Sequence, residues 1–318
     1  MPRKVTLNYV VLDVFTEMPY VGNPLAVVHI PPSTQVTQEQ KLHIAREFNL
    51  SETVFIHDDT LPKDGLNPDQ LADSPITIDI FITEGEIPFA GHPTVGTGCY
   101  LLQTLLPTKF PSTTFTKLAL QTKAGIIPVN AVTSPTLGVS LRVPTDFKIH
   151  EPYAHPQLKS TQSQLTDADF VGGSKAPVPV VSIVKGMTFL LLELASEGAL
   201  GRLQGSSRAD TQLPEGYLGA WDGLLCVYAF VQGKDVVRTR MFMGSMEDPA
   251  TGSAASALCA YLGQSKGPGK RAFHVVQGVE MGRKSEISVV VDVDQSGAVS
   301  EVLLQGPAVQ VMRGQLNI

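Results

Sequence analysis

The stretch Asp248–Ala254, with the sequence DPATGSA, repeats the pattern of His92–Gly98, HPTVGTG, 156 positions earlier in the chain. Each copy has a polar residue, a proline, two further residues, a glycine, a hydroxyl residue and a small residue, and an apolar run follows. Because nearly half of the chain separates the two copies, the pattern indicates an internal duplication. The sequence therefore predicts two similar structural units, each with a helix that begins at this motif.

The two repeated motifs have the features of helix starts. Proline is favoured at the first helical position, so we expect Pro93 and Pro249 there, with His92 and Asp248 just before them. The second helix is expected to end at Gly263. Both helices are apolar around much of their circumference, which predicts that they are buried. With many short apolar runs around them, this pattern favours a helix inside a curled sheet in each unit.

Short runs rich in Val, Ile, Phe and Thr predict most of the regular structure as strands. The expected strands are 7–15, 24–30, 53–57, 76–83, 115–122, 125–131, 178–184, 187–194, 223–231, 236–243, 272–277, 286–293 and 300–304, with a strand-like stretch at 137–143. A helix is predicted over 38–48, because Thr37 is a good N-cap and the apolar residues partly follow helical spacing.

Composition excludes several classes of protein. The 318 residues carry a net charge of −6 with no dense basic cluster, which argues against nucleic acid as a partner. Three cysteines, Cys99, Cys226 and Cys259, form no CxxC pair, which argues against a disulfide framework and a zinc site. The chain lacks an apolar run of membrane-spanning length and a signal-peptide pattern, so we expect a soluble cytoplasmic protein.

Helix N-termini offer unpaired N–H groups and a positive dipole end, so both motifs could hold an anion. Gly96 and Gly252 are expected in the first turn, where either close approach of a ligand or tight packing of the helix would explain a glycine. These two explanations have equal weight. Thr97 and Ser253 would add hydroxyl donors.

Three residues are candidates for proton transfer. Histidine as a residue type can give or take a proton near neutral pH, and His92 would be a poor N-cap, whereas Asp248 would be a good N-cap and could have that role alone. Glu52 lies between a predicted helix and an apolar strand, where a partly desolvated carboxylate could act as a base. An ordinary exposed carboxylate is the simpler interpretation of Glu52, and the residue pattern does not select it.

Taken together, the motifs resemble those of the phenazine-biosynthesis isomerase family (PhzF-like). The segments that carry the resemblance occur in the family's order: Asp13–Thr16 (DVFT), Gly22–Val28 (GNPLAVV), Ser51–Thr53 (SET), Phe89–Gly96 (FAGHPTVG) and Glu247–Ala254 (EDPATGSA). The resemblance extends from residue 10 to about residue 285. It implies an α+β fold of the diaminopimelate-epimerase type, with two pseudo-symmetric halves, each a curled sheet around a central helix. We expect the halves at 1–131 and 132–304, with 305–318 joined to the first.

The resemblance also implies a function. Glu52 matches the family's proton-shuttling carboxylate, and His92 and Asp248 match groups that face the substrate in the cleft between the halves. Asn23, Ser51, Gly91, Thr97, Gly252 and Ser253 are expected to contact a small anionic, carboxylate-bearing substrate, such as a cyclic dihydro-hydroxyanthranilate. The implied reaction is a cofactor-independent isomerisation without a metal, carried out by a homodimer.

Two alternatives remain open at this point. One is a racemase or epimerase of another substrate on the same fold, with a thiol at each helix start; Cys99 and Cys259 do not match each other under the repeat and favour packing roles. The other is a small-molecule-binding or interaction protein without turnover. Asp79, found where the family commonly has a basic residue, and the short loop before Asp248 leave the substrate undefined.

Overall fold

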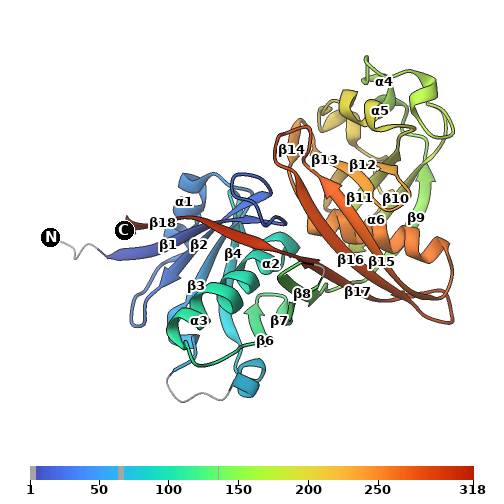
Figure 1. The fold of residues 1–318 in the computed structure, drawn as a ribbon. Coiled ribbons are helices and arrows are strands. Elements are labelled where there is room, and N and C mark those ends of the chain that lie inside the picture. Colours follow the sequence, from blue (N-terminus) through green and yellow to red (C-terminus); the bar gives the residue numbers. More distant parts are fainter. Residues whose placement is uncertain (1–4, 64–67, 135) are drawn as a thin grey trace. The chain divides into compact units, whose positions relative to one another are not determined.

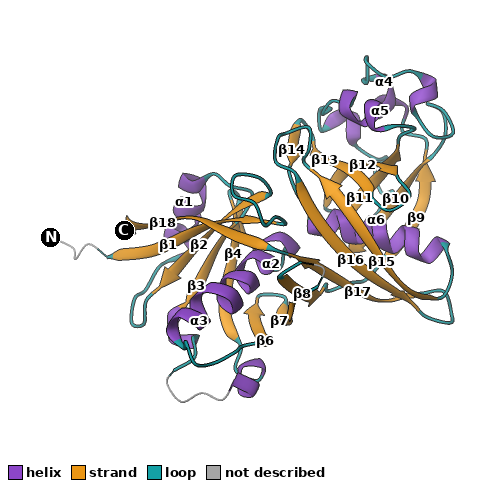
Figure 2. Ribbon diagram, in the orientation of Figure 1, coloured by secondary structure: helices purple, strands orange, loops and turns teal. Residues whose placement is uncertain are grey.

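A computed structural model describes residues 5–63, 68–134 and 136–318 of the chain. Most of the ordered structure is β-strand, with a few short helices (Figures 1 and 2). The chain folds into two compact units, residues 1–142 with 305–318 and residues 143–304. The first unit extends past the boundary expected at residue 131 because strand β8 (Gly138–Arg142) pairs with β7 (Gly125–Val132).

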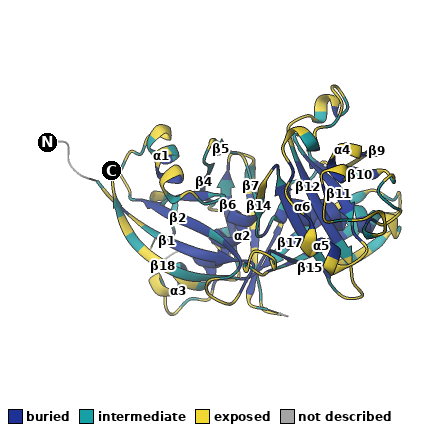
Figure 3. Cartoon of the chain, turned by 90° about the horizontal axis from the view of Figure 1, so that it is seen from above, coloured by how far each residue is buried: buried dark blue, intermediate teal, exposed yellow. Residues whose placement is uncertain are grey.

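The first unit is a curled sheet around one buried helix. Its sheet runs in the order β18–β1–β2–β3–β4–β6–β7–β8, and β5 pairs with the other end of β4. The remaining strand bounds are β1 (Thr6–Val14), β2 (Asn23–Ile30), β3 (Thr53–His57), β4 (Ile76–Ile82), β5 (Gly85–Ile87), β6 (Lys117–Thr122) and β18 (Ala308–Asn317). Helix α2 (Gly91–Tyr100) contacts β1, β2, β3, β8 and β18, and every one of its residues is buried (Figure 3).

Two further elements of this unit position the candidate residues. Helix α1 (Gln38–Phe48) begins at the predicted N-cap Thr37, whose side chain forms a capping box with Gln40. The helix ends at Asn49 in the left-handed conformation, which turns the chain into β3. Helix α2 continues into a π-helical segment (Leu101–Leu105) and then into α3 (Leu106–Lys109).

The second unit repeats this plan. Its sheet runs β9–β10–β11–β12–β13–β15–β16, with β14 on the other end of β13. The strand bounds are β9 (Lys148–Tyr153), β10 (Val178–Val184), β11 (Met187–Glu193), β12 (Leu224–Gln232), β13 (Val237–Met243), β14 (Met246–Asp248), β15 (Gly269–Gln277), β16 (Ser285–Val293) and β17 (Val299–Gly306). The helices are α4 (Pro156–Ser160), α5 (Glu197–Arg202) and α6 (Gly252–Ser265), and the largely buried α6 contacts β10, β11, β15 and β16.

Pairing directions identify the internal duplication. In the first unit, the series β2–α1–β3–β4–β5–α2–β6–β7 contains the parallel pairs β2–β3 and β4–β6. In the second, β11–α5–β12–β13–β14–α6–β15–β16 contains the parallel pairs β11–β12 and β13–β15. The prediction of two similar units, each with a central helix in a curled sheet, agrees with these elements.

The exact helix starts differ from the prediction. Helix α2 begins at Gly91, so Pro93 is its third residue, whereas α6 begins only at Gly252, after the N-cap Thr251. The repeat therefore aligns the sequences but not the first turns of the helices. Gly263 does not end α6; it lies inside the helix, where an added Cβ would meet Val291 at 3.1 Å. Among the described residues, no helix is both long enough and apolar enough to cross a membrane.

Candidate functional site

A carboxylate–imidazole pair links the ends of three elements in the first unit. Glu52 lies immediately before β3, and its Oε2 is 2.8 Å from Nδ1 of His92, the second residue of α2. The Nε2 of His92 lies 3.1 Å from the backbone carbonyl oxygen of Asn23, the first residue of β2. The side chains of His92 and Glu52 are 4% and 16% exposed, so the pair is largely shielded but Glu52 retains access to solvent.

The contact with Asn23 fixes the protonation pattern of the imidazole. A carbonyl oxygen only accepts hydrogen bonds, so Nε2 must carry a proton. The 2.8 Å contact between Nδ1 and Glu52 then requires one more proton, either on the carboxyl group or on the imidazole. The pair is thus arranged to hold one proton that both groups share, next to a carboxylate with some solvent access.

Asn23 and Ser51 support this pair. The hydroxyl of Ser51 donates to Oδ1 of Asn23 at 3.1 Å. This bond joins the residue before Glu52 to the residue of β2 whose backbone oxygen contacts His92. Asn23 is 1% exposed. The structure therefore brings together four of the predicted residues of the first unit, and Gly91 is the first residue of the helix that carries His92.

Gly96 and Thr97 lie two residues further into the helix than predicted, because α2 begins at Gly91 rather than at Pro93. An added Cβ at Gly96 would be 2.6 Å from Leu25 and 2.7 Å from Val14, so tight packing of α2 against the sheet explains this glycine. Thr97 is fully buried, and its hydroxyl has no hydrogen-bond partner within the described part of the chain. The expectation that Gly96 lies in the first turn was wrong, because α2 begins at Gly91.

The second unit holds a hydrogen-bonded group around Asp248. This residue is the last of β14, and its Oδ2 accepts a hydrogen bond from the hydroxyl of Thr251, the N-cap of α6. Asp248 is therefore not the residue that precedes the helix, as the motif had suggested. Gly252 and Ser253 are the first two residues of α6; Gly252 is buried and Ser253 is half-buried.

Gln277, which the sequence did not indicate, connects this group. Its fully buried amide lies at the end of β15, and Nε2 donates to the backbone oxygen of Asp248 at 2.8 Å and to the Thr251 hydroxyl at 3.1 Å. Its Oε1 accepts from the backbone N–H of Thr251 at 3.3 Å and from the hydroxyl of Tyr228 at 3.0 Å. One glutamine thus uses both ends of its amide to fix β14 against the start of α6.

The duplication does not supply a second carboxylate base. In the second unit, the position immediately before β12 corresponds to that of Glu52 before β3, and it is occupied by Gly223. Proton chemistry centred on Glu52 would therefore be restricted to the first unit.

The three cysteines are packing residues. All are free and buried, and burial raises the pKa of Cys99 and of Cys226 to about 12 and that of Cys259 still further. A thiolate nucleophile or base is therefore disfavoured at each position. No group of three or more His, Cys, Asp or Glu side chains among the described residues is arranged to hold a metal ion.

Asp79 belongs to a different cluster. Its carboxylate contacts the ammonium group of the buried Lys41, and Nε2 of His57 lies 2.8 Å from its Oδ2. Burial raises the pKa of Asp79, but hydrogen bonds from His57 and Lys41 outweigh this effect and hold the pKa below its usual value of 3.8. The aspartate thus serves as the counter-charge of Lys41.

Comparisons with known proteins agree with the motifs. The family model for phenazine biosynthesis-like proteins (PhzC-PhzF) matches residues 12–314. An uncharacterized isomerase of Mesorhizobium japonicum is 32% identical, over 98% of this chain and 99% of its own length. The trans-2,3-dihydro-3-hydroxyanthranilate isomerase of Pseudomonas aeruginosa is 31% identical over 88% of each chain. A PhzF-family structure from Bacillus anthracis covers 99% of this chain and 100% of its own, with a TM-score of 0.75 and 22% identity, and so shows the same fold.

Proposed function

The chain belongs to the family of phenazine biosynthesis-like proteins (PhzC-PhzF), and from this premise we propose that it is an isomerase that moves a proton within a small carboxylate-bearing substrate. Glu52 is the proposed acid and base, and His92 is its partner. The observation that carries the proposal is the contact of Glu52 with an imidazole whose other nitrogen is committed to the carbonyl of Asn23.

This geometry suits a one-base proton shift. In the form that acts as a base, the Glu52 carboxylate takes a proton from a substrate carbon, and in the resulting acid form it returns the proton to another carbon of the same molecule. His92 stabilises both forms, because the proton shared through its Nδ1 bonds to Oε2 of Glu52 whether the other carboxylate oxygen is free or carries the proton taken from the substrate. Because Glu52 retains some access to solvent, the proton that it holds can exchange with water between the two steps.

The substrate class is taken from the named relatives. Because the Pseudomonas aeruginosa relative is a trans-2,3-dihydro-3-hydroxyanthranilate isomerase, we propose a cyclic amino or hydroxy acid of that kind. Gly91, Gly252 and Ser253 are the proposed contacts for its carboxylate, since the first N–H groups of a helix lack intrahelical partners. Asp248 is the proposed acceptor for a donor group of the substrate, and Thr97 and Ser51 remain proposed binding residues.

Solvent-deuterium exchange tests the proposal. Wild-type protein in D₂O should incorporate deuterium into trans-2,3-dihydro-3-hydroxyanthranilate or its product, as followed by NMR. Glu52→Gln should abolish incorporation, while calorimetry still detects binding, because the amide keeps the shape but cannot take a proton at neutral pH. Glu39→Gln, the same chemical change on the exposed face of α1, is the matched control and should exchange like wild type.

The outcomes separate the alternatives. Exchange by Glu52→Gln at the wild-type rate would show that another group is the base. Binding without exchange by the wild type would favour a binding protein without turnover. Absence of both would exclude this substrate class.

A further inference from the structure

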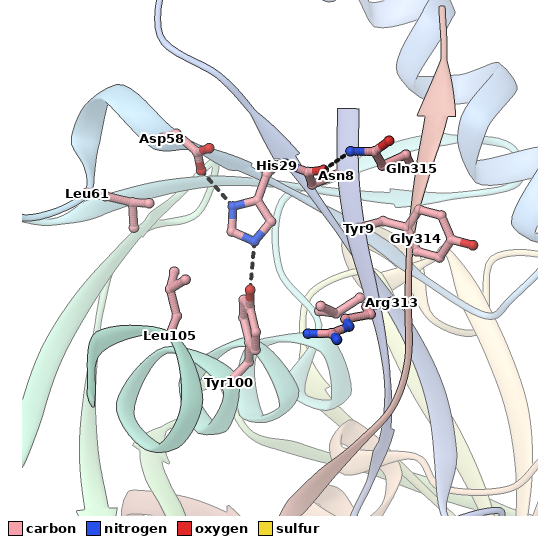
Figure 4. A pocket seen from close by; sticks show the side chains of 11 residues that line it. Asn8, Tyr9, His29, Asp58, Leu61, Tyr100, Leu105, Arg313, Gly314 and Gln315 are labelled. Carbon is pink, nitrogen blue, oxygen red and sulfur yellow. Dashed lines mark hydrogen bonds and ion pairs between the residues drawn. The ribbon is translucent and has the colours of Figure 1, made fainter. Parts of the chain in front are cut away.

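A cavity of about 610 Å³ lies in the first unit where β1, β2 and β18 meet the end of α2 (Figure 4). None of the residues proposed for proton transfer lines it. Its volume is in the range of small-molecule sites, which run from about 300 to 1,000 Å³. The cavity is therefore a separate feature that the proposed isomerase reaction does not use.

A relay of three polar side chains crosses the cavity wall. Nδ1 of His29 lies 2.7 Å from Oδ1 of Asp58, and its Nε2 lies 2.9 Å from the hydroxyl of Tyr100. His29 and Tyr100 are 8% and 6% exposed, so both are held in place by their surroundings. Burial and the nearby charge of Asp58 raise the pKa of Tyr100 to about 12, so its hydroxyl is protonated at neutral pH.

The relay leaves Tyr100 able to bind a ligand in either state of His29. With His29 neutral, the hydroxyl donates to Nε2, and its oxygen can accept a hydrogen bond from the cavity. With His29 protonated, the hydroxyl accepts from Nε2, and its own proton is available to the cavity. The same two hydrogen bonds would also serve to stabilise a buried histidine that has only a structural role. The relay alone therefore does not identify a binding site.

Arg313 supplies the independent observation. It lies on β18 opposite Val10, and its side chain makes no hydrogen bond or ion pair with any other residue that the structure describes. Figure 4 shows its guanidinium group directed from β18 toward the ring of Tyr100. A guanidinium group with free donors binds a carboxylate through two parallel hydrogen bonds.

Two leucines line the opposite side of the cavity. Leu61 and Leu105 lie across the His29–Tyr100 pair from Arg313 (Figure 4). Leu105 ends the π-helical segment that follows Tyr100. Such segments are rare and occur frequently at functional sites. The cavity thus combines one cation, one adaptable hydroxyl and two leucines, and the Asp58 carboxylate that also lines it is already paired with His29.

From this combination we propose that the cavity is a second binding site, for a small organic carboxylate with an apolar ring. Its carboxylate binds Arg313, its ring packs against Leu61 and Leu105, and a polar substituent binds the Tyr100 hydroxyl. The site is independent of the Glu52–His92 pair and of the reaction proposed for it.

Benzoate is a suitable probe, because it has a carboxylate on an apolar ring. Titrated into protein with ¹³C-labelled leucine methyl groups, it should shift the NMR signals of Leu61 and Leu105 in a saturable way. Benzamide, which has the same shape without the charge, should bind at least about tenfold more weakly, since a charge-assisted hydrogen bond is lost. Arg313→Gln should weaken benzoate binding by a similar factor and leave deuterium exchange unchanged.

Two control variants make the result specific. Lys270→Gln removes one positive charge from an exposed side chain of the second unit and should leave the benzoate affinity at the wild-type value. Glu52→Gln should also leave the shifts of Leu61 and Leu105 intact. The proposal is overturned if these two signals do not respond to benzoate, or if Arg313→Gln binds it as tightly as the wild type.

Discussion

The hydroxyl of Thr251 donates a hydrogen bond to the carboxylate of Asp248, three residues earlier in the chain. Because Gln277 already donates to the same hydroxyl oxygen at 3.1 Å, the single proton of Thr251 is directed to Asp248. The carboxylate of Asp248 is thereby oriented by a residue that belongs to the start of α6.

Substitutions of Thr251 should therefore distinguish the effect of its hydroxyl on the orientation of Asp248 from the effect of its side-chain size. Thr251→Val keeps the size of the side chain but removes the hydroxyl, and we expect kcat/KM to fall about tenfold or more, as for loss of a hydrogen bond to a charged group. Thr251→Ser keeps the hydroxyl and should retain most of the activity. Steady-state kinetics of both variants, with melting curves, check this; equal kcat/KM values would leave Thr251 with a purely structural role.

His92 should be required for turnover. His92→Asn removes the imidazole that shares a proton with Glu52, and we expect kcat to fall by about 10² to 10⁴, the range typical of general acid–base catalysis. His43→Asn, on an exposed position of α1, is the matched control. Deuterium exchange and substrate binding measured on both variants test the expectation, which fails if His92→Asn exchanges at the wild-type rate.

Two glycine substitutions should have opposite effects on stability. Gly96→Ala places a methyl group 2.6 Å from Leu25 and 2.7 Å from Val14, and we expect about 1–3 kcal/mol of destabilisation from overpacking. Gly201→Ala, at an exposed position of α5 with no atom within 4 Å of the new Cβ, should stabilise the protein by about 0.5–1 kcal/mol. Chemical unfolding of both variants measures the change in the free energy of unfolding. An unchanged value for Gly96→Ala would show that Leu25 and Val14 move aside to accommodate the methyl group.

Asp79 should make stability depend on pH at the acid end. Because folding lowers the pKa of Asp79, its contribution is fully present above the usual value of 3.8 and is lost as the pH falls through the folded-state pKa. Asp79→Asn leaves the ammonium group of Lys41 buried without its counter-charge, so we expect a loss of about 3 kcal/mol at neutral pH. The difference from wild type should shrink below about pH 4. Unfolding free energies measured from pH 7 to pH 2.5 check this, and a constant difference would contradict it.

Sequence patterns located most strands and the two central helices because apolar periodicity reports burial directly. They placed the starts of α2 and α6 wrongly, because proline at the first helical position is only one of several ways to begin a helix. In α2 the helical hydrogen bonds begin earlier, as Thr94 bonds back to the carbonyl of Ala90 through both its N–H and its hydroxyl.

The candidate site was predicted only where residues lie in recognisable motifs. The duplicated motif singled out His92 and Asp248, whereas only the family resemblance selected Glu52. The 2.8 Å contact between Glu52 and His92 depends on a fold that brings together residues 40 positions apart. Gln277 carried no signal, since a single glutamine at the end of a strand resembles any polar strand end. Its importance comes from four hydrogen bonds, to Tyr228, Asp248 and Thr251, that only the folded chain supplies.

The pairing of β18 with β1, from Thr6 opposite Asn317 to Val14 opposite Ala308, has a consequence for synthesis on the ribosome. All residues of the second unit have been added to the chain by residue 304, whereas the first unit lacks an edge strand until its last residues emerge. The half of the protein that is translated first is therefore the half that closes last. Until then the open edge of β1 is exposed to other nascent chains and to chaperones.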